Sequence, residues 1–344
     1  MCYASKRLLA LLCVVCLMLL GACQSAGRIT EQNGVTVASD PEEAHIDEIA
    51  RANQDTFSNV SAVNGTHLER ELSGVDGKSL RLDAEVKIPD AGCISRFSLV
   101  PLKPNMELAM RLFWGENAAN AEVNQAGGGY KLNTADGRTE FMNWYDANGN
   151  AQNRFAFSYE ASFKDESTGE IAYEDVVKQI KAILNEFGVP DMTITYANRF
   201  GGTINFSFVP KFTPFDIVSS MYMKTPANAQ AAVRPGAIEF VQGRFMLEKA
   251  DEFVLDRLLT LEGALKIVEK SVGGDIVAGE PVYVNSVELR HFYSLDDNAQ
   301  HISAVPVWYF QTNINEVAGD LGETIPTGLF WVDAVSGELY TAFG

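Results

Sequence analysis

The sequence contains little cysteine. Four of its five cysteines lie within the first 23 residues, and only Cys93 follows them. The chain after residue 23 therefore has no pair of cysteines for an internal disulfide, which leaves a packed core to hold the fold. Cys13 and Cys16 have the spacing of a redox motif, but an apolar run surrounds them. We interpret Cys93 as a small buried hydrophobe rather than as a reactive thiol.

Recognisable catalytic and metal-binding motifs are also lacking. The chain has no HExxH, GxSxG, P-loop or dinucleotide-binding glycine motif. Its four histidines stand singly, and His291 and His301 could meet Glu288 only across a hairpin. Zinc needs three or four ligands in a tight tetrahedron, whereas strand alternation puts His291 and Glu288 on opposite faces. We therefore predict no catalytic residue, metal or cofactor, and we place both histidines on a solvated sheet face.

Positive charge is scarce. The chain has 27 lysines and arginines against 45 aspartates and glutamates, which gives a net charge of −18. Nucleic acids and anionic lipid headgroups bind positive surfaces, so the sequence argues against both as partners. A hydrophobic fraction of 47% nevertheless supplies enough apolar side chains for one or more globular cores.

The longest apolar run is too short to cross a membrane comfortably. Leu8–Leu20 contains apolar residues only and follows Lys6 and Arg7. A transmembrane helix needs about 20 such residues. A basic start followed by a short apolar run is typical of a secretory signal peptide, and small residues at positions 21 and 22 suit its cleavage.

The segment Leu20-Gly21-Ala22-Cys23 resembles the lipobox of bacterial lipoproteins. The resemblance implies that the signal peptide is removed before Cys23 and that Cys23 carries lipid. Several acyl chains on one residue hold a protein at a membrane almost permanently. We therefore expect a protein anchored to the cell membrane through Cys23 and facing the extracytoplasmic side.

Changes of composition and period divide the rest of the chain. We predict a signal peptide over 1–22, a flexible tether over 23–40, a mainly β domain over 41–165, and α+β units over 166–250 and 251–344. The predicted fold class is α+β. A mainly antiparallel β region comes first, followed by one or two units in which a helix packs on an antiparallel sheet.

Hydrophobic periodicity carries this assignment. Strict alternation over Leu80–Ile88 predicts a strand with one buried face, and the apolar stripe Val176–Phe187 predicts an amphipathic helix that ends at Gly188. A second helix is predicted from Leu261 to Val272. Other predicted elements are a helix over 41–57, hairpins that turn at 136–137, 148–149 and 201–202, and strands over 281–293, 301–312 and 329–340.

The C-terminal segment resembles the last strands of PepSY-type and YycH/YycI-type extracytoplasmic modules. The residues concerned are Val305–Phe310 and Phe330–Leu339, the latter with an Asp-Ala-x-x-Gly-Glu turn at Asp333–Glu338. The likeness implies a helix on a small antiparallel sheet. Some members of those families regulate envelope enzymes or sensor kinases. The chain is also similar to uncharacterised lipoproteins of clostridia, a likeness that implies no activity.

Aromatic residues are the candidate contact residues. Trp308, Tyr309 and Trp331 stand on the last predicted strands, and Trp144 and Tyr145 precede a predicted turn. Tyrosine and tryptophan are enriched at binding surfaces, although alternate members of such a set commonly fill a core. We predict a non-enzymatic binding or regulatory module that engages an envelope protein or a small ligand. The alternatives are an envelope-polymer hydrolase with an unrecognised site and a purely structural surface module.

Overall fold

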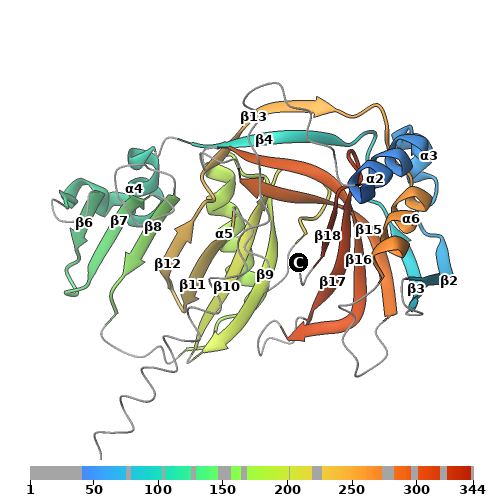
Figure 1. Ribbon diagram of the computed structural model, residues 1–344. Coiled ribbons are helices and arrows are strands. Elements are labelled where there is room, and N and C mark those ends of the chain that lie inside the picture. The colour runs from blue at the N-terminus through green and yellow to red at the C-terminus, as the bar shows by residue number, and fades with distance from the viewer. Residues whose placement is uncertain are drawn as a thin grey trace, which may run out of the picture. The chain divides into compact units, whose positions relative to one another are not determined.

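Two large β-sheets, each with helices packed on one face, make up the fold in the computed structural model (Figure 1). It is a mixed α+β fold in which the sheets are mostly antiparallel. The structure describes residues 41–74, 79–102, 105–124, 129–145, 156–163, 169–200, 202–218, 227–272, 283–295, 301–317 and 324–341. The predicted signal peptide, the lipobox and the tether lie outside these residues, as does the predicted turn at 148–149.

The first sheet has eight strands. In spatial order they are β5 (Glu122–Val123), β6 (Gly129–Asn133), β7 (Thr139–Tyr145), β8 (Ala156–Ala161), β12 (Ala237–Gly243), β11 (Ala229–Arg234), β10 (Thr203–Lys211) and β9 (Asp191–Phe200). Every neighbouring pair is antiparallel. The predicted turn at 136–137 is confirmed, since Gly137 has a φ of 80° and its N–H donates to the Thr134 carbonyl over 3.0 Å.

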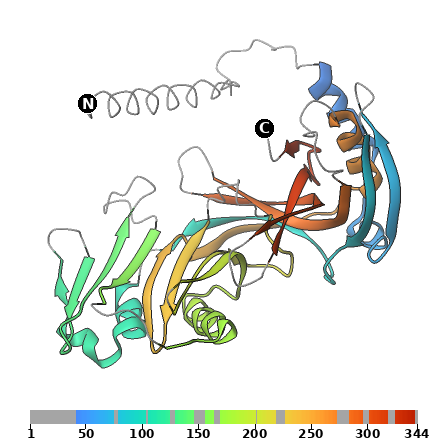
Figure 2. The same cartoon turned by 90° about the horizontal axis from the view of Figure 1, so that it is seen from below.

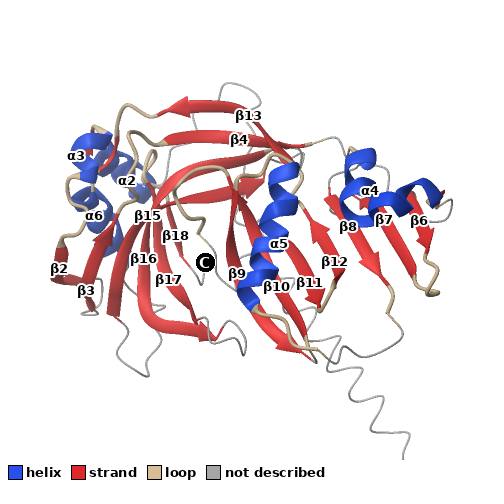
Figure 3. Cartoon of the chain, turned by 180° about the vertical axis from the view of Figure 1, so that it is seen from behind, coloured by secondary structure: helices blue, strands red, loops and turns tan. Residues whose placement is uncertain are grey.

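Helices α4 (Met106–Trp114) and α5 (Tyr173–Glu186) lie across one face of this sheet (Figures 2 and 3). The 3-10 helix η2 (Gly115–Asn120) continues from α4. The predicted stripe on α5 is confirmed, because Val176, Ile180 and Leu184 are all buried in the core against the sheet. Gly188 ends the helix with a φ of 80°, a conformation that glycine adopts at little cost.

The second sheet gathers strands from both ends of the chain. Its order is β13 (Leu247–Val254), β4 (Ser95–Pro101), β16 (Ile302–Val317), β15 (Tyr283–Leu295), β3 (Ser79–Lys87) and β2 (His67–Ser73); β17 (Thr324–Asp333) pairs with β16, and β18 (Leu339–Thr341) pairs with β17. Only the pair of β15 and β3 is parallel among those described.

Helices α2 (Pro41–Ala52), α3 (Phe57–Ser61) and α6 (Leu261–Ser271) group beside this sheet (Figure 1). Apolar residues of β3, β15, β16 and β17 pack against them in one core. The alternation predicted over Leu80–Ile88 is confirmed, since Leu80, Leu82, Ala84 and Val86 are buried and their neighbours are not. The predicted helix over 41–57 is shorter than expected. A two-residue strand, β1 (Gln54–Asp55), follows α2 and pairs with β14 (Leu258–Leu259).

Strand pairing crosses the predicted domain boundaries. The boundary at 165/166 divides the first sheet, because β8 pairs with β12. The boundary at 250/251 falls within β13, which belongs to the second sheet. Residues 42–344 form one compact unit. The pattern of helix followed by strands appears twice along the sequence, but β2 to β4 complete the sheet that the C-terminal strands begin.

Cys93 is exposed, which corrects the prediction that it is buried. It lies in the loop between β3 and β4. In that loop Ile88 and Ile94 are the apolar side chains buried in the core. The order of apolar letters could not show which residues of this loop reach the core.

We expect the Cys93 thiol to react with a small thiol reagent in the native protein as fast as it does after denaturation, because the exposed side chain needs no unfolding to be reached. Labelling with dithionitrobenzoate in native buffer and in guanidinium chloride compares the two rates. In a chain that begins at residue 24, Cys93 is the one remaining cysteine, so Cys93→Ser should abolish labelling. A native rate slowed by more than about a hundredfold would contradict the exposed position.

Candidate functional site

The predicted contact residues do not share one surface. Trp308 is fully buried under α6, and its Nε1 donates to the Leu259 carbonyl over 2.8 Å. Trp308 is therefore a core residue and cannot be the contact residue that the sequence suggested. Tyr309 and Trp331 point to the other face of the second sheet, where they are 1% and 2% exposed. Trp144 lies half-buried on β7, and the side chain of Tyr145 is outside the described part of the chain.

The far face of the second sheet, away from α2 and α6, carries an aromatic cluster of Phe292, Trp331 and Tyr340. Strand register brings them together, since Trp331 pairs with Tyr340 and with Tyr309. The rings of Trp331 and Tyr340 stack with their centroids 6.2 Å apart, and those of Phe292 and Tyr340 are 5.2 Å apart. Trp331 is buried, whereas Phe292 and Tyr340 are partly exposed. Val218 packs beneath them in the same cluster.

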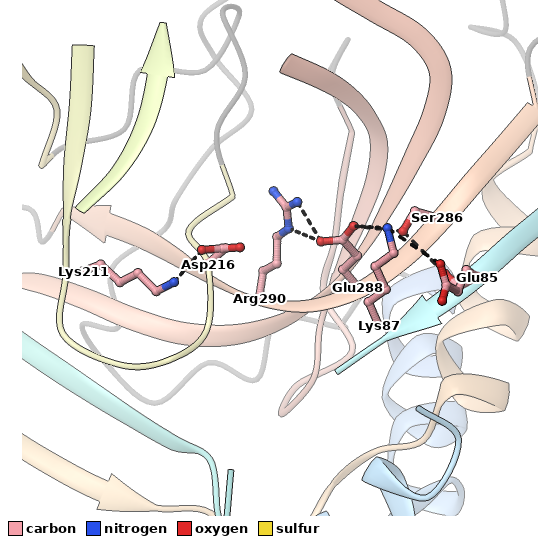
Figure 4. Close-up of polar contacts among 7 residues, drawn as sticks. All are labelled: Glu85, Lys87, Lys211, Asp216, Ser286, Glu288 and Arg290. Atoms are coloured by element: carbon pink, nitrogen blue, oxygen red, sulfur yellow. Dashed lines mark hydrogen bonds and ion pairs between the residues drawn. The ribbon is translucent and has the colours of Figure 1, made fainter. Parts of the chain in front are cut away.

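A charged row lies on the same face, composed of Lys87, Ser286, Glu288 and Arg290 (Figure 4). Oε2 of Glu288 accepts from Nε and Nη2 of Arg290 over 2.9 and 2.7 Å. Its Oε1 accepts from the Ser286 hydroxyl over 2.9 Å and lies 3.8 Å from Nζ of Lys87. The Glu288 and Arg290 side chains are only 14% and 16% exposed, so this pair is fixed more firmly than an ordinary surface ion pair.

Arg290 joins the charged row to the aromatic side of the face. Its guanidinium carbon lies 4.6 Å from the centre of the Tyr309 ring, within cation–π distance. Tyr309 stands opposite Glu288 on the neighbouring strand and opposite Trp331 on the next. Charged and aromatic side chains thus adjoin on one face of β15, β16, β17 and β18, with Arg290, Phe292 and Tyr340 partly exposed around the buried rings of Tyr309 and Trp331.

The segment that follows β10 borders this surface. Nζ of Lys211 lies 2.6 Å from Oδ1 of Asp216, and Arg290 lies between that pair and Glu288 (Figure 4). Ile217 forms a parallel bridge with His291, whose backbone N–H donates to the Asp216 carbonyl and whose carbonyl accepts from Val218. β3 pairs with β15 as far as Lys87. Beyond that point, the segment around Ile217 lies beside β15 in its place.

His291 faces the opposite way from Glu288, as alternation predicted, but it is buried rather than solvated. Its Nε2 donates to the Ser95 carbonyl over 2.8 Å, and its Nδ1 lies 3.2 Å from the Thr213 hydroxyl, which donates to it. The rings of Phe97 and Phe215 meet it in T-shaped contacts, with centroids 5.2 and 5.5 Å away. Burial lowers the pKa of His291 to about 4, so the ring is neutral at pH 7.

Metal chemistry has no evident location in the part of the chain that the structure describes. No group of three or more His, Cys, Asp or Glu side chains there is arranged to hold an ion. The one carboxylate of the charged row, that of Glu288, is paired with Lys87 and Arg290 instead. Across the described ranges, no helix has both the length and the apolar character to span a bilayer.

Sequence patterns missed the charged row. Lys87, Ser286 and Arg290 carried no motif, and only the alternation of Glu288, Arg290 and Phe292 within a predicted strand could have placed those three on one face. The parallel pairing that brings Lys87 opposite Glu288 joins residues 201 positions apart and leaves no local signal.

No protein-family model matches the chain, and no curated protein matches it. Solved structures align with it at low sequence identity, among them the following two. An uncharacterized protein from Eubacterium rectale is 14% identical, with 83% of this chain and 99% of that chain covered and a TM-score of 0.43. The Bacillus megaterium YpeB C-terminal domain is 11% identical, with 70% of this chain and 98% of that domain covered and a TM-score of 0.39. We infer no function from likenesses this weak.

Proposed function

We propose that this protein is a lipid-anchored extracytoplasmic binding module that engages an envelope partner through the far face of the second sheet. The observation that carries the proposal is the continuity of that face. The aromatic cluster and the Glu288–Arg290 pair adjoin through the contact of Arg290 with Tyr309. Aromatic residues and arginine dominate the binding energy of protein interfaces, and rigid strands hold them in place before the partner arrives.

The state of Glu288 favours recognition over catalysis. A general base must present a lone pair to its substrate. Here one carboxylate oxygen accepts two hydrogen bonds from Arg290 and the other accepts from Ser286 beside Lys87. The Glu288 carboxylate thus holds the Arg290 guanidinium in place and is a positioning group.

The PepSY-type resemblance of the C-terminal segment enters the proposal through the turn at Asp333–Glu338. Oδ1 of Asp333 accepts from the N–H groups of Val335 and Ser336 over 2.7 and 2.9 Å. Gly337 has a φ of 83°, and a Cβ there would lie 2.7 Å from Cβ of Ala50. The turn thus packs closely on α2 and sets the position of Tyr340, which follows it into the aromatic cluster.

Membrane attachment through Cys23 is the second part of the proposal, and it rests on the lipobox. In a bacterial host that processes lipoproteins, Cys23→Ser should release the protein from the membrane fraction or leave a full-length precursor, because no thiol remains to be acylated. Fractionation and labelling with a palmitate analogue measure the effect, and Cys93→Ser serves as the matched control. A Cys23→Ser protein that is still cleaved and membrane-bound would exclude the lipid anchor.

Engagement of a partner can be tested by photo-crosslinking in cells of the source organism. We expect the full chain with Tyr340→p-benzoylphenylalanine to form a discrete crosslinked species, because Tyr340 is the partly exposed edge of the aromatic cluster. The same substitution at Glu71, which is exposed on β2, is the control and should give none. Adding Arg290→Ala should weaken the crosslink at least fivefold. Equal crosslinking from both positions would reject this face as the contact surface.

A further inference from the structure

The first sheet has a far face of its own, turned away from α4 and α5. On that face, one side chain from each of six adjacent strands falls into a single transverse row. The register pairs Tyr196 with Ser207, Ser207 with Gln230, and Gln230 with Gln242. It continues through Ser158 to Asn143. We call these six residues, Tyr196, Ser207, Gln230, Gln242, Ser158 and Asn143, the neutral row.

None of the six carries a charge, and none is buried. This composition stands out in a chain of net charge −18, in which exposed strand positions elsewhere hold many carboxylates. The amide of Gln242 donates to that of Gln230 over 3.1 Å, so neighbouring members are close enough to act together. Adjacent strands lie about 4.8 Å apart, which sets the spacing of hydrogen-bonding groups along the row.

A second row runs beside the neutral row, two residues further along the same strands. In it, Glu160 stands between Phe240 and Phe141 on the flanking strands. Both phenylalanines remain partly exposed, and neither belongs to the core formed with α4 and α5. The face therefore offers two apolar rings, with the exposed Glu160 between them, alongside a line of amides and hydroxyls.

We propose that this face binds a chain of uncharged sugars laid across the strands. A sugar hydroxyl both donates and accepts hydrogen bonds, as do amides and the hydroxyls of serine and tyrosine. The C–H face of a pyranose ring is apolar and packs on an aromatic ring, which the phenylalanines provide. A neutral ligand also avoids the cost of stripping water from an unpaired charge. Because the strands hold the backbone of the row in place, binding a ligand requires little further ordering and so costs little conformational entropy.

Calorimetry with the purified full chain in detergent tests this assignment, with cellohexaose, mannohexaose and hexa-N-acetylchitohexaose as uncharged probes. We expect at least one hexasaccharide to bind. Gln230→Glu should weaken that binding at least tenfold. A carboxylate cannot donate a hydrogen bond to the sugar, and removing its bound water costs free energy. Gln179→Glu, the same change on the exposed side of α5, should alter it less than twofold. Phe240→Ala should also weaken it, by removing one stacking ring.

Thermal unfolding of each variant separates loss of binding from loss of fold, since exposed glutamine-to-glutamate changes should leave the melting temperature within about 2 °C. Failure of all three hexasaccharides to bind would overturn the proposal, as would binding that Gln230→Glu and Phe240→Ala leave unchanged in folded protein. Analytical ultracentrifugation of the wild type and of Gln230→Glu tests whether a second copy of the chain binds this face instead. A wild-type dimer that Gln230→Glu dissociates would assign the face to a second copy of this chain instead of to a sugar.

Discussion

A chain that lacks residues 330–344 should fail to fold. The deletion removes part of β17 and all of β18, and with them the buried side chains of Phe330, Trp331 and Val332. It also strips β16 of its partner over Val307–Phe310. Each lost large side chain costs about 3–5 kcal/mol, and a domain is stable by only about 5–15 kcal/mol. We expect the truncated protein to be insoluble or degraded, as measured by soluble yield and circular dichroism.

Phe330→Ala provides a graded version of the same test. It should lower the free energy of unfolding by about 3–5 kcal/mol, because it empties a site in the core shared with α6. Phe200→Ala, at a position 77% exposed, is the matched control and should change stability by less than about 0.5 kcal/mol. A truncated protein with an unchanged melting temperature would show that β17 is no part of the core.

Acid should destabilise the protein through His291. In the unfolded chain this histidine takes up a proton near pH 6.5, whereas burial lowers its pKa in the folded protein to about 4. Between these values the unfolded state binds more protons, so the free energy of unfolding falls as the pH falls. The contribution is complete above pH 6.5 and is lost progressively down to pH 4, by about 3 kcal/mol in all. Urea unfolding at pH 7, 6, 5 and 4 measures it.

Substitution isolates the part of this pH dependence that belongs to His291. His291→Gln should flatten the dependence between pH 6.5 and 4, even if it lowers stability at pH 7, because glutamine takes up no proton. Gln179→Asn, on the exposed side of α5, is the control and should leave the slope as it is in the wild type. Nearby Lys249 and Glu252 act on His291 in opposite directions and remain in both variants. An identical slope in wild type and His291→Gln would remove His291 as the cause.

The sequence by itself determined the local elements that carry strong periodicity. The alternation at Leu80–Ile88 fixed β3 and its buried face, and the stripe from Val176 to Phe187 fixed α5. The Asp136-Gly137 turn and the strands β7 and β10 also followed from local signals. The local sequence is enough to predict these elements, because the period of the apolar residues shows both the type of element and which side of it is buried.

Short or weakly periodic elements were not predicted. Helix α4 and the strands β4, β11, β12 and β13 carried no such signal, and their place came from packing against partners distant in sequence. The pairing of β3 with β15 is the plainest example, since it joins strands about 200 residues apart that lie in the first and the last of the predicted units. Sheet pairing depends on contacts that local propensity does not encode.

The candidate sites show the same limit. Alternation assigned Glu288 and His291 to opposite faces, but only the tertiary structure decided that His291 is buried in contact with two phenylalanines and that Glu288 meets Lys87. It also decided that Trp308 fills the core and that Cys93 is exposed. A strand has two faces that its sequence can distinguish from each other. The sequence does not say which of these faces another segment covers or which charges meet there. Both are decided only when distant parts of the chain come together.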